Sequence, residues 1–242
     1  MDAPQSPHVE AEARFDHLWE QTLRRFERGE CEADEFLSGV QPDHRMGITL
    51  LARLPEAVLE AVRPRLAVLA AAFPEQYVQP ESDLHVTILS IEPARESFAP
   101  RAGQVEAILE AVDAEVRGTP PFECVFRGLS AGSSAAFFCG YPVGAALNEF
   151  RERIRRACHD RSAGFSVESR YPNIGAHVTV LRFLEPRISA GQFALLKQLR
   201  SEPLAHAALT HLELVQNDWY MRLENLTHYA SWVLTSPARS LP

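Results

Sequence analysis

Apolar residues recur along the chain at two spacings, and each spacing predicts one kind of secondary structure. Helical spacing predicts helices at residues 10–30, 56–73, 103–116, 145–160 and 189–200. Apolar, β-prone runs predict strands at 46–55, 84–89, 176–181 and 229–235, a hairpin at 121–142, and two strands joined at Asn217-Asp218 within 208–225. Pro64 is expected to kink or break the second of these helices. The chain is therefore expected to mix helices and strands throughout.

Two of the predicted strands carry the same polar pattern inside an apolar run. "LHVTIL" (84–89) contains His85 and Thr87, and "AHVTVL" (176–181) contains His177 and Thr179. Successive side chains of a strand point to opposite faces, so each histidine shares a face with its threonine. The valines and isoleucines between and after them face the other way and are expected to feed a core. Two strands therefore each present an imidazole and a hydroxyl on one face.

The sequence around these strands is loosely duplicated. Each half contains a helix, an extended segment, the histidine strand, the dipeptide "EP" (92–93 and 185–186) and a further helix. This repetition predicts two similar halves that face one another, as in an α+β body and not a parallel doubly wound sheet. We expect residues 1–45 to form an N-terminal leader and amphipathic helix, and residues 46–242 to form the domain that contains both halves.

Charge and cysteine content narrow the classes of partner. The net charge is −8, from 32 acidic and 24 basic residues, whereas proteins that grip long duplex nucleic acid usually present a basic surface. A small phosphorylated ligand in one locally basic cleft is compatible with that charge. No run approaches the roughly 20 apolar residues of a membrane span, and the N-terminus lacks the pattern of a secretion signal. Four scattered cysteines suit reduced thiols in the cytoplasm and match no zinc-site spacing.

The histidine pair points to acid–base chemistry. A lone strand histidine is usually a hydrogen-bonded core or surface residue, but two matching segments favour a shared site. Imidazole titrates near neutrality, so one histidine can act as a base and the other as an acid. The threonine hydroxyls are neutral donors suited to phosphoryl oxygens. Such a pair can drive in-line displacement at a phosphodiester without a metal, and the sequence has no convincing metal-ligand cluster.

These motifs also resemble those of a known family. "VQPESDLHVTIL", "GFSVESRYPNIGAHVTVLR" and the closing "NLTHYASWVL" are similar to segments of the 2H phosphoesterase superfamily, which includes LigT-like RNA 2',3'-cyclic phosphodiesterases and 2'-5' RNA ligases. The resemblance covers roughly residues 46–236. It implies a bilobal fold, with two pseudo-symmetric lobes of antiparallel sheet around a central cleft and helices outside. It implies His85 and His177 as catalytic acid and base, with Thr87 and Thr179 binding phosphate.

Other polar residues have two interpretations each. Arg182 follows the second histidine by five residues and either neutralises phosphate charge or, because strand parity turns it away from Thr179, forms a structural ion pair. Arg170 and Tyr171 lie before the second motif and either line the cleft mouth or belong to a solvated loop. Trp219 is expected to pack beside a turn, although stacking on a base is an alternative. The basic run 151–156 is expected to be a solvated helix face.

The expected function is that of a metal-independent phosphodiesterase. It would hydrolyse 2',3'-cyclic phosphates or 2'-5' linkages of nucleotides or RNA ends, with no cofactor. A non-catalytic nucleotide or RNA-end binding module on the same fold is the alternative. A metal-dependent hydrolase with His85 and His177 as ligands is weakest, because the sequence offers no convincing cluster of Asp, Glu and His ligands. The natural substrate, the division of acid and base roles and the oligomeric state are left open.

Overall fold

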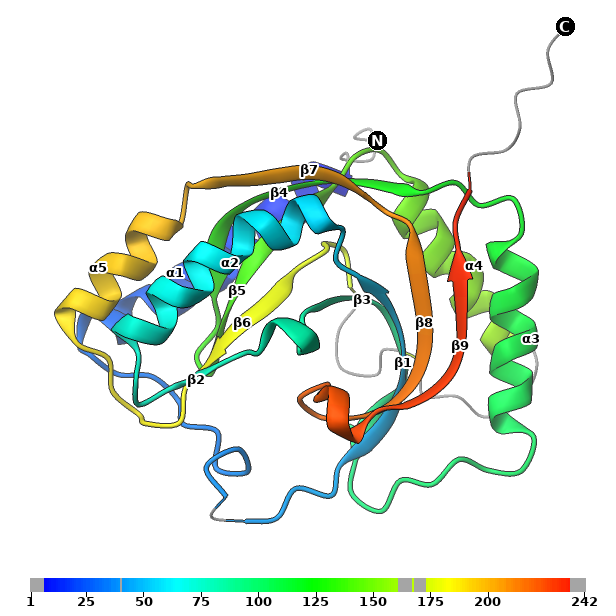
Figure 1. Cartoon of the computed structure of the whole chain (residues 1–242), viewed down its shortest axis with the longest axis horizontal. Coiled ribbons are helices and arrows are strands. Elements are labelled where there is room, and N and C mark those ends of the chain that lie inside the picture. The colour runs from blue at the N-terminus through cyan, green and yellow to red at the C-terminus, as the bar shows by residue number, and fades with distance from the viewer. Residues whose placement is uncertain (1–6, 40, 161–166, 168–172, 236–242) are drawn as a thin grey trace, which may run out of the picture.

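A computed structural model describes residues 7–39, 41–160, 167 and 173–235 of the chain (Figure 1). Within these residues five α-helices accompany two antiparallel sheets. The helices are α1 (Pro7–Glu27), α2 (Glu56–Ala72), α3 (Gln104–Val116), α4 (Ala146–Asp160) and α5 (Ala190–Leu199). No helix of this described part is long and apolar enough to cross a membrane.

Each sheet takes strands from distant parts of the chain. The four-stranded sheet has the order β3-β1-β8-β9, with β3 (His85–Arg95), β1 (Met46–Arg53), β8 (His211–Asp218) and β9 (Thr227–Val233). The five-stranded sheet has the order β2-β6-β5-β4-β7, with β2 (Tyr77–Val78), β6 (Val178–Arg182), β5 (Ala135–Pro142), β4 (Phe122–Ala131) and β7 (Pro203–Leu209). The first motif lies on β3 and the second at β6, so each sheet contributes one motif. The predicted bilobal α+β fold is confirmed.

The helices pack against the faces and edges of the two sheets. In Figure 1, α3 and α4 stand together beyond the four-stranded sheet, and α1 and α5 run along the five-stranded sheet. Helix α1 buries residues spaced three or four apart, which is the amphipathic pattern expected from the sequence. Helix α5 begins at a capping box, in which Ser189 and Gln192 each bond the other's backbone N–H.

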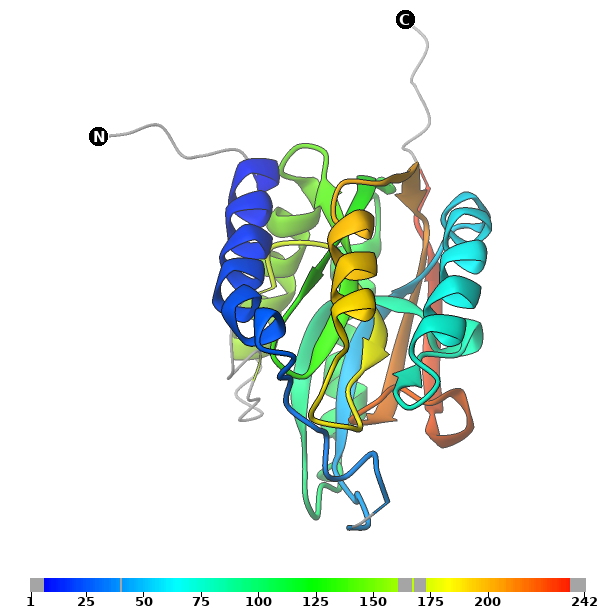
Figure 2. The same ribbon diagram turned by 90° about the vertical axis from the view of Figure 1, so that its left-hand side faces the viewer.

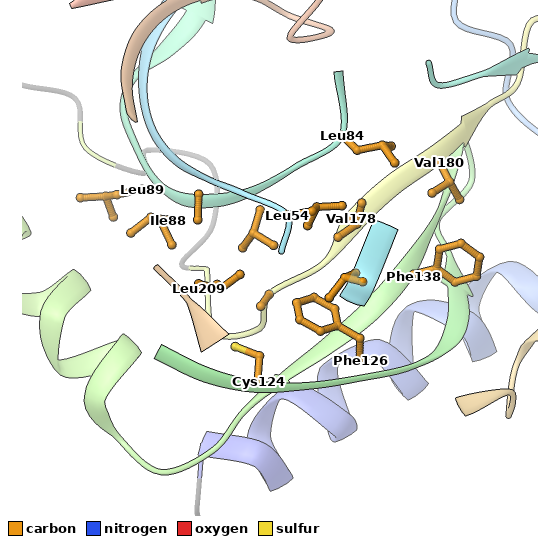
Figure 3. Packing of buried hydrophobic residues seen from close by; sticks show 14 of the residues in the cluster. Leu54, Leu84, Ile88, Leu89, Cys124, Phe126, Phe138, Val178, Val180 and Leu209 are labelled. Carbon is orange, nitrogen blue, oxygen red and sulfur yellow. The ribbon is translucent and has the colours of Figure 1, made fainter. Parts of the chain in front are cut away.

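One hydrophobic core connects the two sheets. Figure 3 shows Ile88 of β3, Val178 of β6 and Phe126 of β4 packed within it. Val86 and Val180 are also fully buried, as the alternation of the two motifs predicts. Burial of each such aliphatic side chain stabilises the fold by about 1.5–3 kcal/mol. The apolar residues of the motifs therefore hold the two sheets together while the polar residues face away.

The structure differs from the sequence prediction in the C-terminal part and at Pro64. Asn217 and Asp218 are the last buried residues of β8 and not the centre of a turn. The turn follows them, because the Asp218 carboxylate accepts the backbone N–H groups of Tyr220 and Arg222. Strand β7 was not predicted, since its alanine-rich sequence has little β propensity. Helix α2 continues through the exposed Pro64 without a break.

Gly140 allows β5 to approach the segment that leads into β6. Its carbonyl accepts the backbone N–H of Ala176 at 2.8 Å. A Cβ added at Gly140 would lie 2.1 Å from the carbonyl oxygen of Ala176, which is far inside van der Waals contact. This close approach places the residue before His177 directly against the sheet.

We predict that Gly140→Ala lowers the free energy of unfolding by about 1–3 kcal/mol, because two backbones must move apart. Gly191→Ala is the matched control, since a Cβ there meets only Ser189 Oγ at 3.9 Å within helix α5. That control should leave stability unchanged or raise it by up to about 1 kcal/mol. Urea unfolding of both variants measures the difference, and equal stabilities would contradict the prediction.

Candidate active site

The four motif residues line one cavity between the two sheets. The cavity has a volume of about 400 Å³ and is lined by His85, Thr87, His177 and Thr179. Within the described part of the chain, neither threonine hydroxyl has a hydrogen-bond partner in the protein. Both hydroxyls are therefore available to a ligand in the cavity, as the shared faces of the two motifs predict.

His85 is oriented by the turn that precedes it. Its Nδ1 lies 2.8 Å from the backbone carbonyl oxygen of Asp83. A carbonyl only accepts hydrogen bonds, so Nδ1 carries a proton and donates it. The other ring nitrogen, Nε2, is then the one left for a ligand. The Asp83 carboxylate holds the turn in place by accepting the backbone N–H of Leu223.

His177 is held by aromatic packing. It lies directly before β6, and its ring centroid is 5.3 Å from that of Phe137 in an edge-on arrangement. Phe137 in turn contacts Phe15 of helix α1, with centroids 5.5 Å apart. Gly175 leaves room for this helix, because a Cβ there would lie 2.4 Å from the Phe15 ring.

A β-bulge follows each His-x-Thr motif at the same position. Leu50 of β1 pairs with Leu89 of β3 and the next residue, Leu51, pairs with Thr87, which leaves Ile88 as the extra residue. Ala136 of β5 pairs with Leu181 of β6 and the next residue, Phe137, pairs with Thr179, which leaves Val180 as the extra residue. In both strands the extra residue stands three positions after the histidine. A bulge reverses the alternation of faces beyond it, so simple parity fails there.

The bulge in β6 places Arg182 in the cavity. Arg182 lines the same cavity as Thr179, whereas uninterrupted alternation would have turned it away. Its guanidinium carbon lies 5.1 Å from the centroid of the Tyr220 ring. Ser90 is the corresponding residue after the bulge in β3, and it also lines the cavity. The parity argument against Arg182 in the cleft was therefore wrong.

Two further residues line the cavity. Trp219 packs in the turn after β8, as expected, with the Arg45 guanidinium carbon 4.4 Å from its ring centroid, and it also lines the cavity, so stacking on a base stays a prediction. Arg14, from helix α1, also lines the cavity and had no signal in either motif. Arg170 and Tyr171, two of the predicted candidates, lie outside the described residues.

A comparison with known families agrees with this geometry. The model described as the 2'-5' RNA ligase superfamily matches residues 51–219, a range that contains both motifs. The chain belongs to the 2'-5' RNA ligase superfamily. This membership confirms the resemblance to LigT-like 2H phosphoesterases. The predicted boundary between residues 45 and 46 stays a prediction.

Solved structures share the fold of this superfamily member. TT0787 of Thermus thermophilus is 17% identical, with a TM-score of 0.56, and the match covers 78% of this chain and 97% of that chain. E. coli LigT complexed with 3'-AMP is 16% identical, with a TM-score of 0.54, and the match covers 79% of this chain and 99% of LigT. LigT complexed with NADP+ is 15% identical, with a TM-score of 0.53 and the same coverages. No curated protein matches the chain.

The cavity of this superfamily member attracts anions. Among the described residues that line it, Arg14 and Arg182 carry positive charge, and no aspartate or glutamate is present. The whole chain has a net charge of −8, so this distribution runs against the overall composition. Low-dielectric walls focus the field of such charges into the cavity. No group of three or more metal-binding side chains occurs in the part of the chain that the structure describes.

Both histidines are neutral at neutral pH when the cavity is empty. Each is half-buried, and the pKa of His85 and of His177 is lowered to about 4, chiefly by removal of the ring from water. The nearby charge of Arg182 contributes to the lowering of both pKa values. The Asp83 carbonyl acts in the opposite direction on the pKa of His85, because it stabilises the imidazolium. A bound anion would raise both pKa values by the same Coulombic rule.

Arg151 of helix α4 connects the two motifs. It is fully buried, and its guanidinium donates to the backbone carbonyls of Thr87 at 3.1 Å, Ile88 at 2.8 Å and Gly175 at 2.8 Å. Thr87 and Ile88 are the last residue of the first His-x-Thr motif and the residue after it, and Gly175 lies two residues before His177. One cation therefore fixes the separation of the two motifs.

The expectation of a solvated helix face was wrong for Arg151. It shares a helix face with the buried Leu147, Ile154 and Cys158, at spacings of four, three and seven residues. This helical spacing was visible in the sequence, but the run of basic residues obscured it. Arg156, at the other end of the run, is exposed as expected.

We predict that Arg151→Lys lowers the free energy of unfolding by about 1–3 kcal/mol, because an ammonium cannot reach all three carbonyls that the guanidinium bonds. Arg156→Lys, on the exposed side of the same helix, should change it by less than about 0.5 kcal/mol. Urea unfolding gives the stabilities. Hydrogen exchange at the Ala176 amide, which bonds Gly140, should accelerate only in Arg151→Lys. Unchanged exchange together with unchanged stability would contradict the role of Arg151.

Proposed function

We propose that this chain is a phosphodiesterase that hydrolyses 2',3'-cyclic phosphates or 2'-5' linkages of nucleotides or RNA ends. The observation that carries the proposal is the single cavity, in which two His-Thr pairs meet Arg182 and, among the described residues, no carboxylate. Acid–base catalysis by two imidazoles suits this arrangement because the site offers neutral donors and positive charge to a phosphodiester.

The proposed reaction is an in-line displacement at phosphorus. One histidine removes a proton from water as the water oxygen bonds to phosphorus. The bond from phosphorus to one ribose oxygen breaks, and the other histidine gives that oxygen a proton, which leaves a phosphomonoester and a hydroxyl. Thr87 and Thr179 donate to the non-bridging oxygens, and Arg182 offsets the negative charge that develops on them.

We assign the acid role to His85 and the base role to His177. The carbonyl of Asp83 accepts from Nδ1 of His85 and favours its protonated form. Arginine charges lower the pKa of both rings, but among the described residues no carbonyl opposes this effect at His177. A bound substrate raises the pKa values of the pair, so that the pair takes up one proton. His85 therefore carries this proton, and His177 keeps a free lone pair.

The proposed ligand is a nucleotide or an RNA end, held without a metal ion. Solved structures of E. coli LigT hold 3'-AMP and NADP+, which supports a nucleotide as the ligand class. Long duplex nucleic acid is not proposed, because the chain is acidic outside this cleft. Four free, buried cysteines suit the reducing cytoplasm, which we propose as the location.

We predict that His85→Ala and His177→Ala each lower kcat on a nucleoside 2',3'-cyclic phosphate by about 10²–10⁴-fold, with the protein still folded. His206→Ala is the matched control, since that histidine is exposed on β7 beside Glu123. Turnover should persist in excess chelator. Ligand binding without turnover would favour the binding module, and loss of activity in chelator would favour the metal-dependent hydrolase.

We predict that kcat/KM falls as pH rises from about 5 to about 8, because the free enzyme then loses the single proton that the histidine pair needs. The rate falls with rising pH because both pKa values are lowered, so the free enzyme already loses this proton below neutral pH. Arg182→Gln removes a positive charge, so its kcat/KM profile should move to higher pH as well as decrease. Steady-state rates across this pH range test both statements. A wild-type maximum at alkaline pH would contradict them.

A further inference from the structure

Helix α1 lies outside the segment that the superfamily model matches. That segment begins at residue 51, whereas α1 spans Pro7–Glu27. Figure 2 shows α1 beside α5, along the five-stranded sheet. The superfamily match therefore says nothing about the contribution of α1 to the cavity.

Several contacts fix α1 on the five-stranded sheet. Ser130 of β4 donates its hydroxyl to the buried carbonyl of Phe15 at 2.7 Å. Thr22 donates its hydroxyl to the carbonyl of Ala131 at 3.2 Å. The Phe15 ring packs on Phe137, which packs on the His177 imidazole. The helix is therefore a fixed wall on the His177 side of the cavity.

Arg14 is the charged residue that this wall presents to the cavity. It lines the cavity next to Phe15 and Leu18, and it is exposed. The acidic residues two positions to either side already have partners: Glu12 pairs with Arg127, and Asp16 pairs with Arg200. Within the described residues, Arg14 itself has no ion pair or hydrogen bond. Its charge is available to a ligand.

The positive charge of Arg14 suits a ligand that carries a second anionic group. The reacting phosphodiester already has both threonine hydroxyls and Arg182 as partners in the proposed mechanism. Arg14 comes from a separate helix, and the Phe15 and Phe137 rings lie between that helix and His177. A ribose that carries a phosphate at each end presents two such groups, one on the 2' and 3' oxygens and one on the 5' oxygen.

We propose that Arg14 binds the 5'-phosphate of the reacting nucleotide, so that the protein selects 2',3'-cyclic nucleotides that are also phosphorylated on the 5' oxygen. This inference rests on the proposed function and names its substrate class. The 5'-phosphate belongs either to a free nucleotide or to the last nucleotide of an RNA chain, and the chemistry that Arg14 recognises is the same in both.

The test compares three substrates: a nucleoside 2',3'-cyclic phosphate, its 5'-phosphorylated form, and a dinucleotide that ends in a 2',3'-cyclic phosphate. Arg14→Gln should lower kcat/KM by about tenfold or more for the 5'-phosphorylated form, the loss expected for one charged hydrogen bond. The substrate without a 5'-phosphate should change by less than about twofold, within the usual effect of a surface substitution. A similar loss on the dinucleotide identifies the RNA end as a source, and no loss there identifies the free nucleotide.

Arg24→Gln is the matched control, because Arg24 is exposed on the same helix and does not line the cavity. It should leave the rates on all three substrates unchanged. Equal losses on all substrates in Arg14→Gln would assign Arg14 to the reacting phosphate and overturn the proposal. No loss on the 5'-phosphorylated mononucleotide would overturn it as well.

Calorimetric binding separates this inference from the proposed function. The probes are a nucleoside 3'-phosphate and the corresponding 3',5'-bisphosphate. Arg14→Gln should weaken the bisphosphate by about tenfold and leave the monophosphate within about twofold. If the wild type turns over no substrate but shows this pattern, the phosphodiesterase function fails and the Arg14 site stands. If the bisphosphate binds no better than the monophosphate, or does not bind, the Arg14 site fails.

Discussion

The bonds from one buried guanidinium to three backbone carbonyls hold the candidate site together. Arg151 reaches the carbonyls of Thr87 and Ile88 on one side of the cleft and that of Gly175 on the other. Backbone carbonyls at a bulge or strand end lack a ladder partner, and burying them unpaired would be costly. A planar donor with several N–H groups satisfies three at once. The two histidines therefore keep their separation although they belong to different sheets.

That arrangement explains how an acidic protein can offer an anion site. Carboxylates are absent from the described cavity lining, and both imidazoles stay neutral in the empty site because water is largely excluded from them. In the proposed function, a phosphodiester that enters would supply the negative charge that one imidazolium needs. Protonation and substrate binding would then be coupled, and the carbonyl of Asp83 would favour the proton on His85.

Sequence patterns predicted much of the fold and the centre of the site, and they failed where local rules changed. Alternation correctly placed the motif valines in the core and the histidines with their threonines on the cavity. It failed for Arg182, because a bulge adds one residue to β6 without a recognisable signal. It failed for Arg151, because a basic run conceals one member on the apolar face of its helix. Arg14 was missed because its role depends on where α1 docks.

The sequence by itself determined which side chains share a face with each histidine, since the periodicity of a strand or helix is a local property of the backbone. It also determined the acid–base and donor chemistry that those side chains supply. Its loose duplication indicated that the two motifs face one another. Only the tertiary structure decided that both imidazoles lose most of their water and that α1 closes one wall of the cavity with Arg14. Those features depend on contacts between residues far apart in the chain, which no local pattern specifies.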